Sequence, residues 1–236
     1  MSDRALNYEL DGKVAVLSID DGRANAIGHD LIDDLNTALE RAEKEAHAVL
    51  IIGRPGRFSA GFDLSVMTGS VDGMQNLVKA GADMLVRLYM HPQPVVAACT
   101  GHALAAGALI LLVSDTRIGV KGDFKLGLNE VAIGMGLPIF GIEFARDRLS
   151  KRHLTAAVSQ GTVYSPDEAR DVGYLDTVVA EEALIDTART EAQRLAELAT
   201  GAVALTKITL RGKTADYINA TLEEDIAGFT PPVPKK

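Results

Sequence analysis

The stretch of residues 95–113 constrains the fold more than any other part of this sequence. It is almost wholly apolar, and it is long enough to span a lipid bilayer as a helix. However, Pro94 precedes it, and Gly101 and Gly107 divide it. A buried strand, a tight loop and a buried helix explain these interruptions better than a membrane span does. We therefore predict a core segment of a globular protein that does not enter a membrane.

A strand followed by a glycine-rich loop and a helix also occurs earlier in the chain. Residues 48–52 form an apolar run typical of a buried strand, and the glycine-rich loop 53–61 follows directly. The next predicted helix has one apolar face, made of Leu77, Gly81, Met84, Leu85 and Leu88. Buried strands that alternate with helices indicate an α/β fold with parallel strand pairing.

The two ends of the chain complete the predicted architecture. Strands 6–9 and 14–17 flank an Asp-Gly turn, and a helix of residues 31–44 follows with Asp30 as its N-cap. From residue 137 onward the pattern predicts one short strand at 175–179 and helices at 138–149, 151–160, 166–172, 181–199 and 203–226. The proline-rich tail 230–234 cannot be helical. We predict a core of residues 1–180 and a helical C-terminal region of residues 181–236.

Charge and cysteine content exclude several classes of protein. The chain of 236 residues has 32 acidic and 24 basic residues, a net charge of −8 and no basic block. Because nucleic-acid binding normally needs a positive surface, we exclude that partner class. Cys99 is the only cysteine, and the five histidines lack the spacing of metal ligands, so we expect no disulfide and no metal site. The N-terminus has no apolar signal segment, which predicts a cytoplasmic protein.

Two glycine motifs come close to known catalytic signatures without matching them. Gly134 and Gly136 lack the correctly spaced third glycine of a dinucleotide-binding fingerprint. The segment 56–61 has one residue too many for the nucleophile elbow of a serine hydrolase. These motifs therefore indicate neither dinucleotide binding nor serine hydrolase activity.

The two glycine-containing loops are the best candidates for chemistry. Both contain small residues, Ser-Ala-Gly at 59–61 and Ala-Ala-Gly at 105–107. Small side chains let a ligand approach the main chain, and N–H groups at a helix start favour developing negative charge. Two such groups converging on one carbonyl oxygen would form an oxyanion hole. The alternative is that these glycines only allow helices to pack on strands.

Four motifs along the chain resemble those of one known family. Residues 58–64 (Phe-Ser-Ala-Gly-Phe-Asp-Leu) and 94–107, followed by Asp115, resemble the two signature loops of the crotonase family, the enoyl-CoA hydratase/isomerase superfamily. Residues 23–27 (Arg-Ala-Asn-Ala-Ile) resemble its Asn-Ala-Leu turn, and residues 128–131 (Leu-Asn-Glu-Val) resemble its Pro-Glu loop. The motifs follow the family's order, and the resemblance covers nearly the whole chain.

This resemblance implies a fold, an assembly and a substrate. It implies a spiral of ββα units with a helical C-terminal extension, and a homotrimer or dimer of trimers formed through the C-terminal helices. The implied substrate is a coenzyme A thioester, and the enolate of this thioester is stabilised by the N–H groups of Phe62 and Ala106. No permanently bound cofactor is implied. The residues implied to surround the substrate are Ala24, Ala26, Ala60, Gly61, Asp63, Gly107 and Leu109. Asp63 is also a candidate cap for the following helix.

The acid–base residues decide which reaction the resemblance implies. Hydratases of the family use two glutamates, and these positions match Leu109 and Glu130. Leucine cannot transfer a proton, and loss of one of two cooperating groups forfeits about 10²–10⁴ in rate. Glu130 alone suits a one-base isomerase, and an apolar wall at Leu109 would raise its carboxyl pKa. The alternative for Glu130 is a solvated loop carboxylate or an ion-pair partner of a nearby arginine.

Several other side chains have two interpretations each. We expect His102 to pack or to contact pantetheine rather than to catalyse. Lys207 and Arg211, four residues apart on a predicted helix, either bind the coenzyme A phosphates or form a solvated basic face. Five apolar side chains either line an acyl tunnel or belong to the ordinary core; these are Met67, Met84, Met90, Met135 and Leu109.

We therefore predict an acyl-CoA enzyme that most specifically catalyses Δ3,Δ2-enoyl-CoA isomerisation with Glu130 as acid/base. The first alternative is an enoyl-CoA hydratase with an atypical site. The second is a non-catalytic acyl-CoA-binding protein, because Leu109 removes part of the proton-transfer machinery. A serine hydrolase would need Ser59 near a histidine base.

Overall fold

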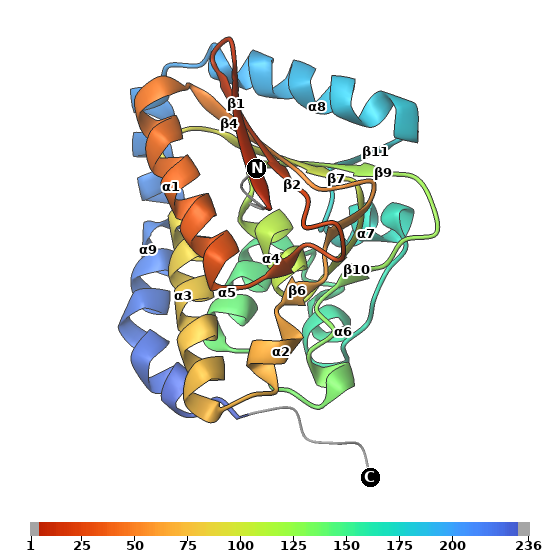
Figure 1. The fold of residues 1–236 in the computed structure, drawn as a ribbon, viewed down its shortest axis with the longest axis vertical. Coiled ribbons are helices and arrows are strands. Elements are labelled where there is room, and N and C mark those ends of the chain that lie inside the picture. The colour runs from red at the N-terminus through yellow and green to blue at the C-terminus, as the bar shows by residue number, and fades with distance from the viewer. Residues whose placement is uncertain (1–4, 231–236) are drawn as a thin grey trace.

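A six-stranded sheet is the main layer of the fold. The computed structural model describes residues 5–230. The strand order is β1 (Leu6–Asp11), β2 (Val14–Ile19), β4 (Ala48–Ile52), β7 (Val95–Cys99), β9 (Thr116–Val120) and β11 (Thr177–Val179). Strands β1 and β2 pair antiparallel, and the four other neighbouring pairs are parallel (Figure 1). The predicted α/β fold with parallel pairing is confirmed.

Helices cover both faces of this sheet, because its central strands are apolar on both sides. Val49 and Ile51 of β4 belong to the core formed with α1 (His29–Glu45) and α3 (Val71–Tyr89). Leu50 belongs to a second core, formed with α8 (Glu181–Ala196). Figure 1 shows α8 above the sheet, whereas α3, α4 and α5 lie below it. Burial on both faces explains the uninterrupted apolar runs of these strands.

The apolar segment 95–113 divides as predicted. It forms β7, then β8 (Gly101–Leu104), then α4 (Ala106–Val113). All residues of α4 are buried, which accounts for its uniformly apolar sequence. Within residues 5–230, no helix combines the length and the apolar character needed to cross a membrane.

Two small parallel sheets accompany the main sheet. One has the order β10 (Leu126–Gly127), β8 and β5 (Gly56–Ser59); the other pairs β3 (Ala26–Ile27) with β6 (Gly61–Phe62). The predicted loop at 53–61 contains β5 and the first residue of β6, and β8 lies where we expect the tight loop within 95–113, so these two loop predictions are wrong for the residues of the three strands. A Cβ on Gly101 would lie 2.1 Å from the carbonyl carbon of Gly56, so glycine permits this close pairing. Such contacts between distant segments leave no local periodicity in the sequence.

Three successive units of the chain share one pattern. Each has a strand of the main sheet, a strand of the small sheet and a helix. The units are β4–β5–α3, β7–β8–α4 and β9–β10–α5, where α5 spans Ile139–Arg148; the short α2 (Leu64–Met67) precedes α3. This succession is the ββα repeat that the resemblance implied.

The last part of the chain is helical, as predicted. After a 3-10 helix at Val131–Ile133 come α5, α6 (Leu154–Val158), α7 (Pro166–Val172), α8 and α9 (Thr200–Ala227). At the other end, α1 begins at His29 with Gly28 as N-cap, so Asp30 lies in the first turn and the predicted Asp30 cap is wrong. Asp30 there complements the helix dipole instead. Beyond residue 230, the predicted non-helical tail lies outside the described residues.

A buried ion cluster fastens α9 to the main sheet. The Asp115 carboxylate accepts a hydrogen bond from the N–H of Val95 at 2.7 Å and pairs with Lys207 at 2.5 Å and Arg211 at 2.8 Å. The two cations are only 6% and 3% exposed, so the alternative of a solvated basic face is wrong. A carboxylate that compensates two buried charges is costly to remove.

Neutralising Asp115 should destabilise the fold strongly, because two buried cations lose their carboxylate. We expect Asp115→Asn to lower the free energy of unfolding by about 3 kcal/mol in urea denaturation. Glu223→Gln is the control, since it removes an exposed ion pair between α9 and Lys79 of α3; we expect a change below about 0.5 kcal/mol. Equal losses in the two variants would contradict a structural role of the buried cluster.

Candidate active site

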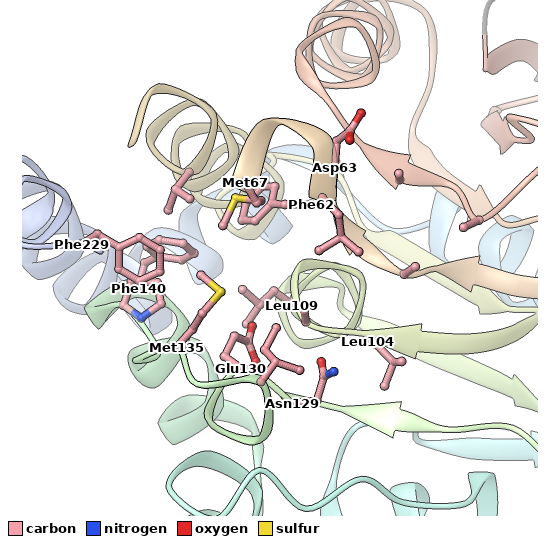
Figure 2. A pocket seen from close by; sticks show the side chains of 18 residues that line it. Phe62, Asp63, Met67, Leu104, Leu109, Asn129, Glu130, Met135, Phe140 and Phe229 are labelled. Atoms are coloured by element: carbon pink, nitrogen blue, oxygen red, sulfur yellow. The ribbon is translucent and has the colours of Figure 1, made fainter. Parts of the chain in front are cut away.

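A largely apolar cavity of about 620 Å³ lies beside the small sheets (Figure 2). It is lined by Ala24, Ala26, Ala60, Phe62, Asp63, Leu64, Met67, Val78, Leu104, Ala105, Leu109, Asn129, Glu130, Ile133, Met135, Pro138, Phe140 and Phe229. Among these described residues, only Asp63 and Glu130 carry titratable side chains. A mostly apolar cavity with few polar groups is typical of a small-molecule site.

Most of the predicted site residues meet at this cavity. Its wall includes Ala24, Ala26, Ala60, Phe62, Asp63, Leu109 and Glu130. Gly61 lies in β6, and Ala106 and Gly107 are the first two residues of α4, directly beside the cavity residues Phe62 and Ala105. Lys207 lies elsewhere: its ammonium donates to the carbonyls of His91 and Gln93 and to Asp115. The prediction that Lys207 lies at the substrate site is therefore wrong for this chain.

Two segments, which we call the first loop (residues 58–64, including β6) and the second loop (residues 100–107, including β8 and the start of α4), touch each other through glycine. Gly61 has a φ of +96°, and a Cβ there would lie 2.8 Å from Ala105 Cβ and 3.3 Å from the amide nitrogen of Ala106. A Cβ on Gly107 would lie 2.4 Å from the carbonyl oxygen of Ser59. The glycines therefore serve packing, and that packing brings the main chains of the two loops together.

Asn25 holds the turn that forms one edge of the cavity. It is fully buried with a φ of +51°, and its side-chain amide donates to the carbonyls of Ile19 at 2.8 Å and Phe58 at 3.1 Å. The Ser59 hydroxyl donates to the Asn25 carbonyl at 2.7 Å. Because Ser59 has this structural bond and its side chain does not line the cavity, the geometry does not support it as a nucleophile.

The main-chain N–H groups of Phe62 and Ala106 have distinct local environments. The Asp63 N–H donates to the Ile27 carbonyl, so strand alternation turns the preceding N–H, that of Phe62, away from β3. Ala106 is the first residue of α4, where a helix supplies no acceptor for the N–H. Before it, the Ala105 N–H donates to the Gly127 carbonyl, and Ala105 has a φ of 50°, a region that favours glycine.

Asp63 acts as the predicted helix cap. Its carboxylate accepts hydrogen bonds from the hydroxyl of Ser65 at 2.6 Å and from the Ser65 N–H at 2.8 Å. These bonds hold the pKa of Asp63 below its ordinary value. In Figure 2 its carboxylate points away from Glu130. Asp63 is therefore a poor candidate for a second proton-transfer group.

Glu130 is a buried carboxyl group without a charged partner. It is 8% exposed, and its Oε2 has no hydrogen-bond partner among residues 5–230. Burial raises the pKa of Glu130 to about 7. The alternatives of a solvated carboxylate and of an arginine ion pair are therefore wrong. A carboxyl group that titrates near neutral pH can both accept and donate a proton.

The surroundings of Glu130 explain its high pKa. Leu109, on the second turn of α4, is 1% exposed and lines the same cavity (Figure 2). An apolar wall provides neither charge nor hydrogen bonds to stabilise the ionised form. The neighbouring Asn129 also lines the cavity, and its Oδ1 lacks a partner among the described residues. The sequence motifs do not indicate Asn129 as a site residue, although it adjoins Glu130.

The remaining candidates separate into site and core. His102 packs edge-on against Phe124, and its Nδ1 accepts a hydrogen bond from the N–H of Lys125, which supports a packing role. Met67 and Met135 line the cavity at the edge of the core, whereas Met84 lies in the core away from the cavity wall and Met90 packs against that core. Within residues 5–230, no cluster of His, Cys, Asp and Glu side chains is arranged to hold a metal ion.

Two aromatic residues that sequence analysis missed line the cavity. Phe140 comes from α5, and Phe229 comes from the segment after α9 (Figure 2). The amide of Gln75 on α3 donates to the Phe229 carbonyl at 3.2 Å and holds that segment in place. Only the folded arrangement of α3, α5 and α9 brings these rings together, so no local signal in the sequence indicates them.

Nearly the whole chain, residues 9–235, matches one family model, described as enoyl-CoA hydratase/isomerase. The chain belongs to the enoyl-CoA hydratase/isomerase family. A family member from Pseudomonas syringae of known crystal structure is 41% identical, with a TM-score of 0.94 over 96% of this chain and 98% of that chain. The human mitochondrial delta3-delta2-enoyl-CoA isomerase structure is 30% identical, with a TM-score of 0.90 over 94% of this chain and 89% of that chain.

The family includes isomerases and hydratases, and both resemble this enzyme. The curated human enoyl-CoA delta isomerase 1 is 30% identical, covering 92% of this chain and 73% of the human protein. The short-chain-enoyl-CoA hydratase of Clostridium acetobutylicum is also 30% identical, covering 93% of this chain and 86% of that protein. This chain is thus an enzyme of the isomerase or lyase class, and equal identities leave the reaction to be argued from its site.

Glu130 should make the stability of the enzyme depend on pH. Burial raises its pKa from 4.5 to about 7, so the folded state retains a proton that the unfolded state releases within this window. Stability is therefore lost as the pH rises from about 4.5 to about 7, by up to about 3 kcal/mol. We expect Glu130→Gln to melt well above the wild type at pH 8 and close to it at pH 4.5.

The control for this prediction is Glu224→Gln, which changes an exposed residue of α9. It should shift the melting temperature equally little at both pH values. A stabilisation by Glu130→Gln that is the same at pH 4.5 and pH 8 would contradict the titration of a buried Glu130.

Proposed function

We propose that this enzyme converts 3-enoyl-CoA thioesters into 2-enoyl-CoA thioesters. The observation that carries the proposal is the carboxyl group of Glu130, which is buried in an apolar cavity, has an Oε2 without a hydrogen-bond partner among residues 5–230, and has a pKa raised to about 7. One group that both removes and returns a proton suits an isomerase, because the reaction needs no net proton donor.

The proposed oxyanion hole consists of the N–H groups of Phe62 and Ala106. The contact between the two loops supports this assignment, because Gly61 lies directly before Phe62 and against the amide of Ala106. The start of α4 adds the positive end of a helix dipole. Removing one donor of such a pair typically lowers turnover by about 10²–10³. Both donors would polarise the thioester carbonyl and stabilise the enolate.

The proposed proton transfer follows from this geometry. The Glu130 carboxylate removes a proton from C2 of the 3-enoyl thioester, and the electron pair delocalises through C3–C4 and the carbonyl into a dienolate. The same carboxyl group then returns the proton to C4, which leaves the double bond between C2 and C3. Atoms and charge balance without a cofactor, so we propose the coenzyme A thioester as substrate and no resident cofactor.

Leu109 argues against efficient hydration. Water addition needs one group to activate water and another to protonate the substrate, and the cavity offers one suitable carboxyl. Asp63 is hydrogen-bonded to Ser65 and directed away from Glu130. Slow or atypical hydration remains the alternative reaction. A purely binding role would leave the burial of the Glu130 carboxyl in this cavity unexplained.

The assembly and the location are further proposals. Exposed apolar side chains on α9, at Leu205, Ile208 and Leu210, support a homotrimer or a dimer of trimers formed through the C-terminal region. Cytoplasmic location stays a prediction from the N-terminal sequence.

One assay in heavy water distinguishes the candidate functions. The purified enzyme is mixed with 3-enoyl-CoA or 2-enoyl-CoA, and products and deuterium incorporation are followed by mass spectrometry. Interconversion of the two isomers is the expected result. Formation of hydroxyacyl-CoA alone would support hydration, and tight binding without exchange or product would support the binding protein; either would overturn the proposal.

Glu130→Gln tests the acid/base assignment. We expect turnover to fall by at least about 10³, because the amide cannot accept the proton, while acyl-CoA affinity stays within a few-fold. Asn129→Ala is a comparison variant, since it changes the neighbouring polar side chain without removing the carboxyl. Wild-type turnover in Glu130→Gln would refute the one-base mechanism.

Leu109→Glu tests why hydration is inefficient. A second carboxyl group on the cavity wall supplies the missing proton-transfer group, so we expect a rise of at least about tenfold in hydration of 2-enoyl-CoA. Leu109→Gln is the matched control, with the same shape and no titratable proton. Equal hydration by both variants would show that the second carboxyl is not what the site lacks.

A further inference from the structure

A glycine within α3 faces the aromatic ring of Phe62. Gly81 is buried near the middle of this helix. A Cβ on Gly81 would lie 2.3 Å from Cε1 and 2.4 Å from Cζ of Phe62. Carbon atoms in contact normally lie about 3.5–4.0 Å apart. The tip of the ring therefore occupies the space that any other residue at position 81 would need.

The backbone conformation does not account for this glycine. Gly81 is not among the described residues with positive φ, and it lies well inside the helix rather than at a cap. Glycine in a helix interior weakens the helix, because the unfolded chain loses more freedom on folding. Its neighbours on the same face, Leu77, Met84 and Leu85, are ordinary buried residues. The ring of Phe62 is the contact that requires glycine.

Phe62 combines this ring with one of the two proposed oxyanion donors. We propose that Gly81 is a positioning residue: the recess that it leaves on α3 holds the Phe62 ring and thereby fixes the direction of the Phe62 N–H. The inference rests on the proposed function, since it concerns the same oxyanion hole. It adds a distant helix position to the residues that set the geometry of that hole.

The recess complements two main-chain constraints on the first loop. Gly61 sets the turn through its positive φ, and the Asp63 N–H is bound to Ile27. These two constraints fix the backbone before and after Phe62, whereas the contact of the ring with α3 fixes Phe62 itself. The ring also lines the cavity, so a ring expelled from the recess must enter the substrate space or shift the loop. A displacement of about 1 Å at such a donor lowers turnover by about 10².

The test is a double-mutant cycle between positions 62 and 81. Gly81→Ala fills the recess, and we expect kcat to fall at least about tenfold. Phe62→Ala keeps the N–H and removes the ring, so adding Gly81→Ala to it should change kcat by less than about twofold. Gly212→Ala is the matched control, because it replaces a helical glycine of α9 that has open space around its Cβ position; it should leave kcat unchanged.

A spectroscopic measurement separates positioning from general damage. The carbonyl stretch of a bound saturated acyl-CoA shifts to lower frequency when N–H groups donate to the thioester oxygen. We expect Gly81→Ala to reduce this shift, and Gly212→Ala to leave it as in the wild type. Because this ligand does not react, the readout stays valid even if the isomerisation assay fails and the proposed function is wrong.

Two results would overturn the inference. One is a Gly81→Ala variant whose kcat and carbonyl shift equal those of the wild type. The other is an equal loss of kcat when Gly81→Ala is added to the wild type and to Phe62→Ala. If Gly81→Ala does not fold, we use Phe62→Leu in its place, because leucine fills the recess only partly. That variant should lower kcat and reduce the carbonyl shift, and unchanged values would again overturn the inference.

Discussion

The contact between the first and second loops through glycine determines where the chemistry of this enzyme can occur. Gly61 and Gly107 place the main chain of one loop directly against the other, at distances where a Cβ would meet Ala105 or the Ser59 carbonyl. Each loop follows a buried strand of the main sheet, so the rigid sheet sets the position of both. The packing role of these glycines and the proposed oxyanion hole both depend on the same close approach.

Burial of Glu130 depends on that arrangement. The loops, α4 and the 129–138 segment enclose an apolar cavity in which the carboxyl group has no ion-pair partner among the described residues. The same burial that destabilises its ionised form raises its pKa to about 7, where proton removal and return are both accessible. In the proposed mechanism the burial that lowers stability at Glu130 also makes its carboxyl group reactive, a combination that is common at active sites.

Local patterns predicted the parts of the fold that depend on local interactions. Apolar periodicity predicted β4, β7, α3 and α7, and the order of motifs indicated Phe62 and Glu130, which line the same cavity. The pairing of β5 with β8 was missed, because it depends on the contact of Gly56 with Gly101 rather than on periodicity.

Long-range packing also explains the other errors. Lys207 resembles a solvent-exposed cation in the sequence, but the folded chain buries it against Asp115. Phe140 and Phe229 reach the cavity only because α5 and the end of α9 converge there. The function of Gly81 likewise depends on a ring from another element, so its place on an apolar helix face did not distinguish it from ordinary core.

A crystal structure with a bound enoyl-CoA or an unreactive analogue tests the central claim most directly. The account predicts the thioester oxygen about 2.7–3.1 Å from the amide nitrogens of both Phe62 and Ala106, with C2 and C4 of the acyl chain facing the Glu130 carboxyl. A thioester bound elsewhere in the cavity, or amides hydrogen-bonded to neighbouring carbonyls in the complex, would contradict it.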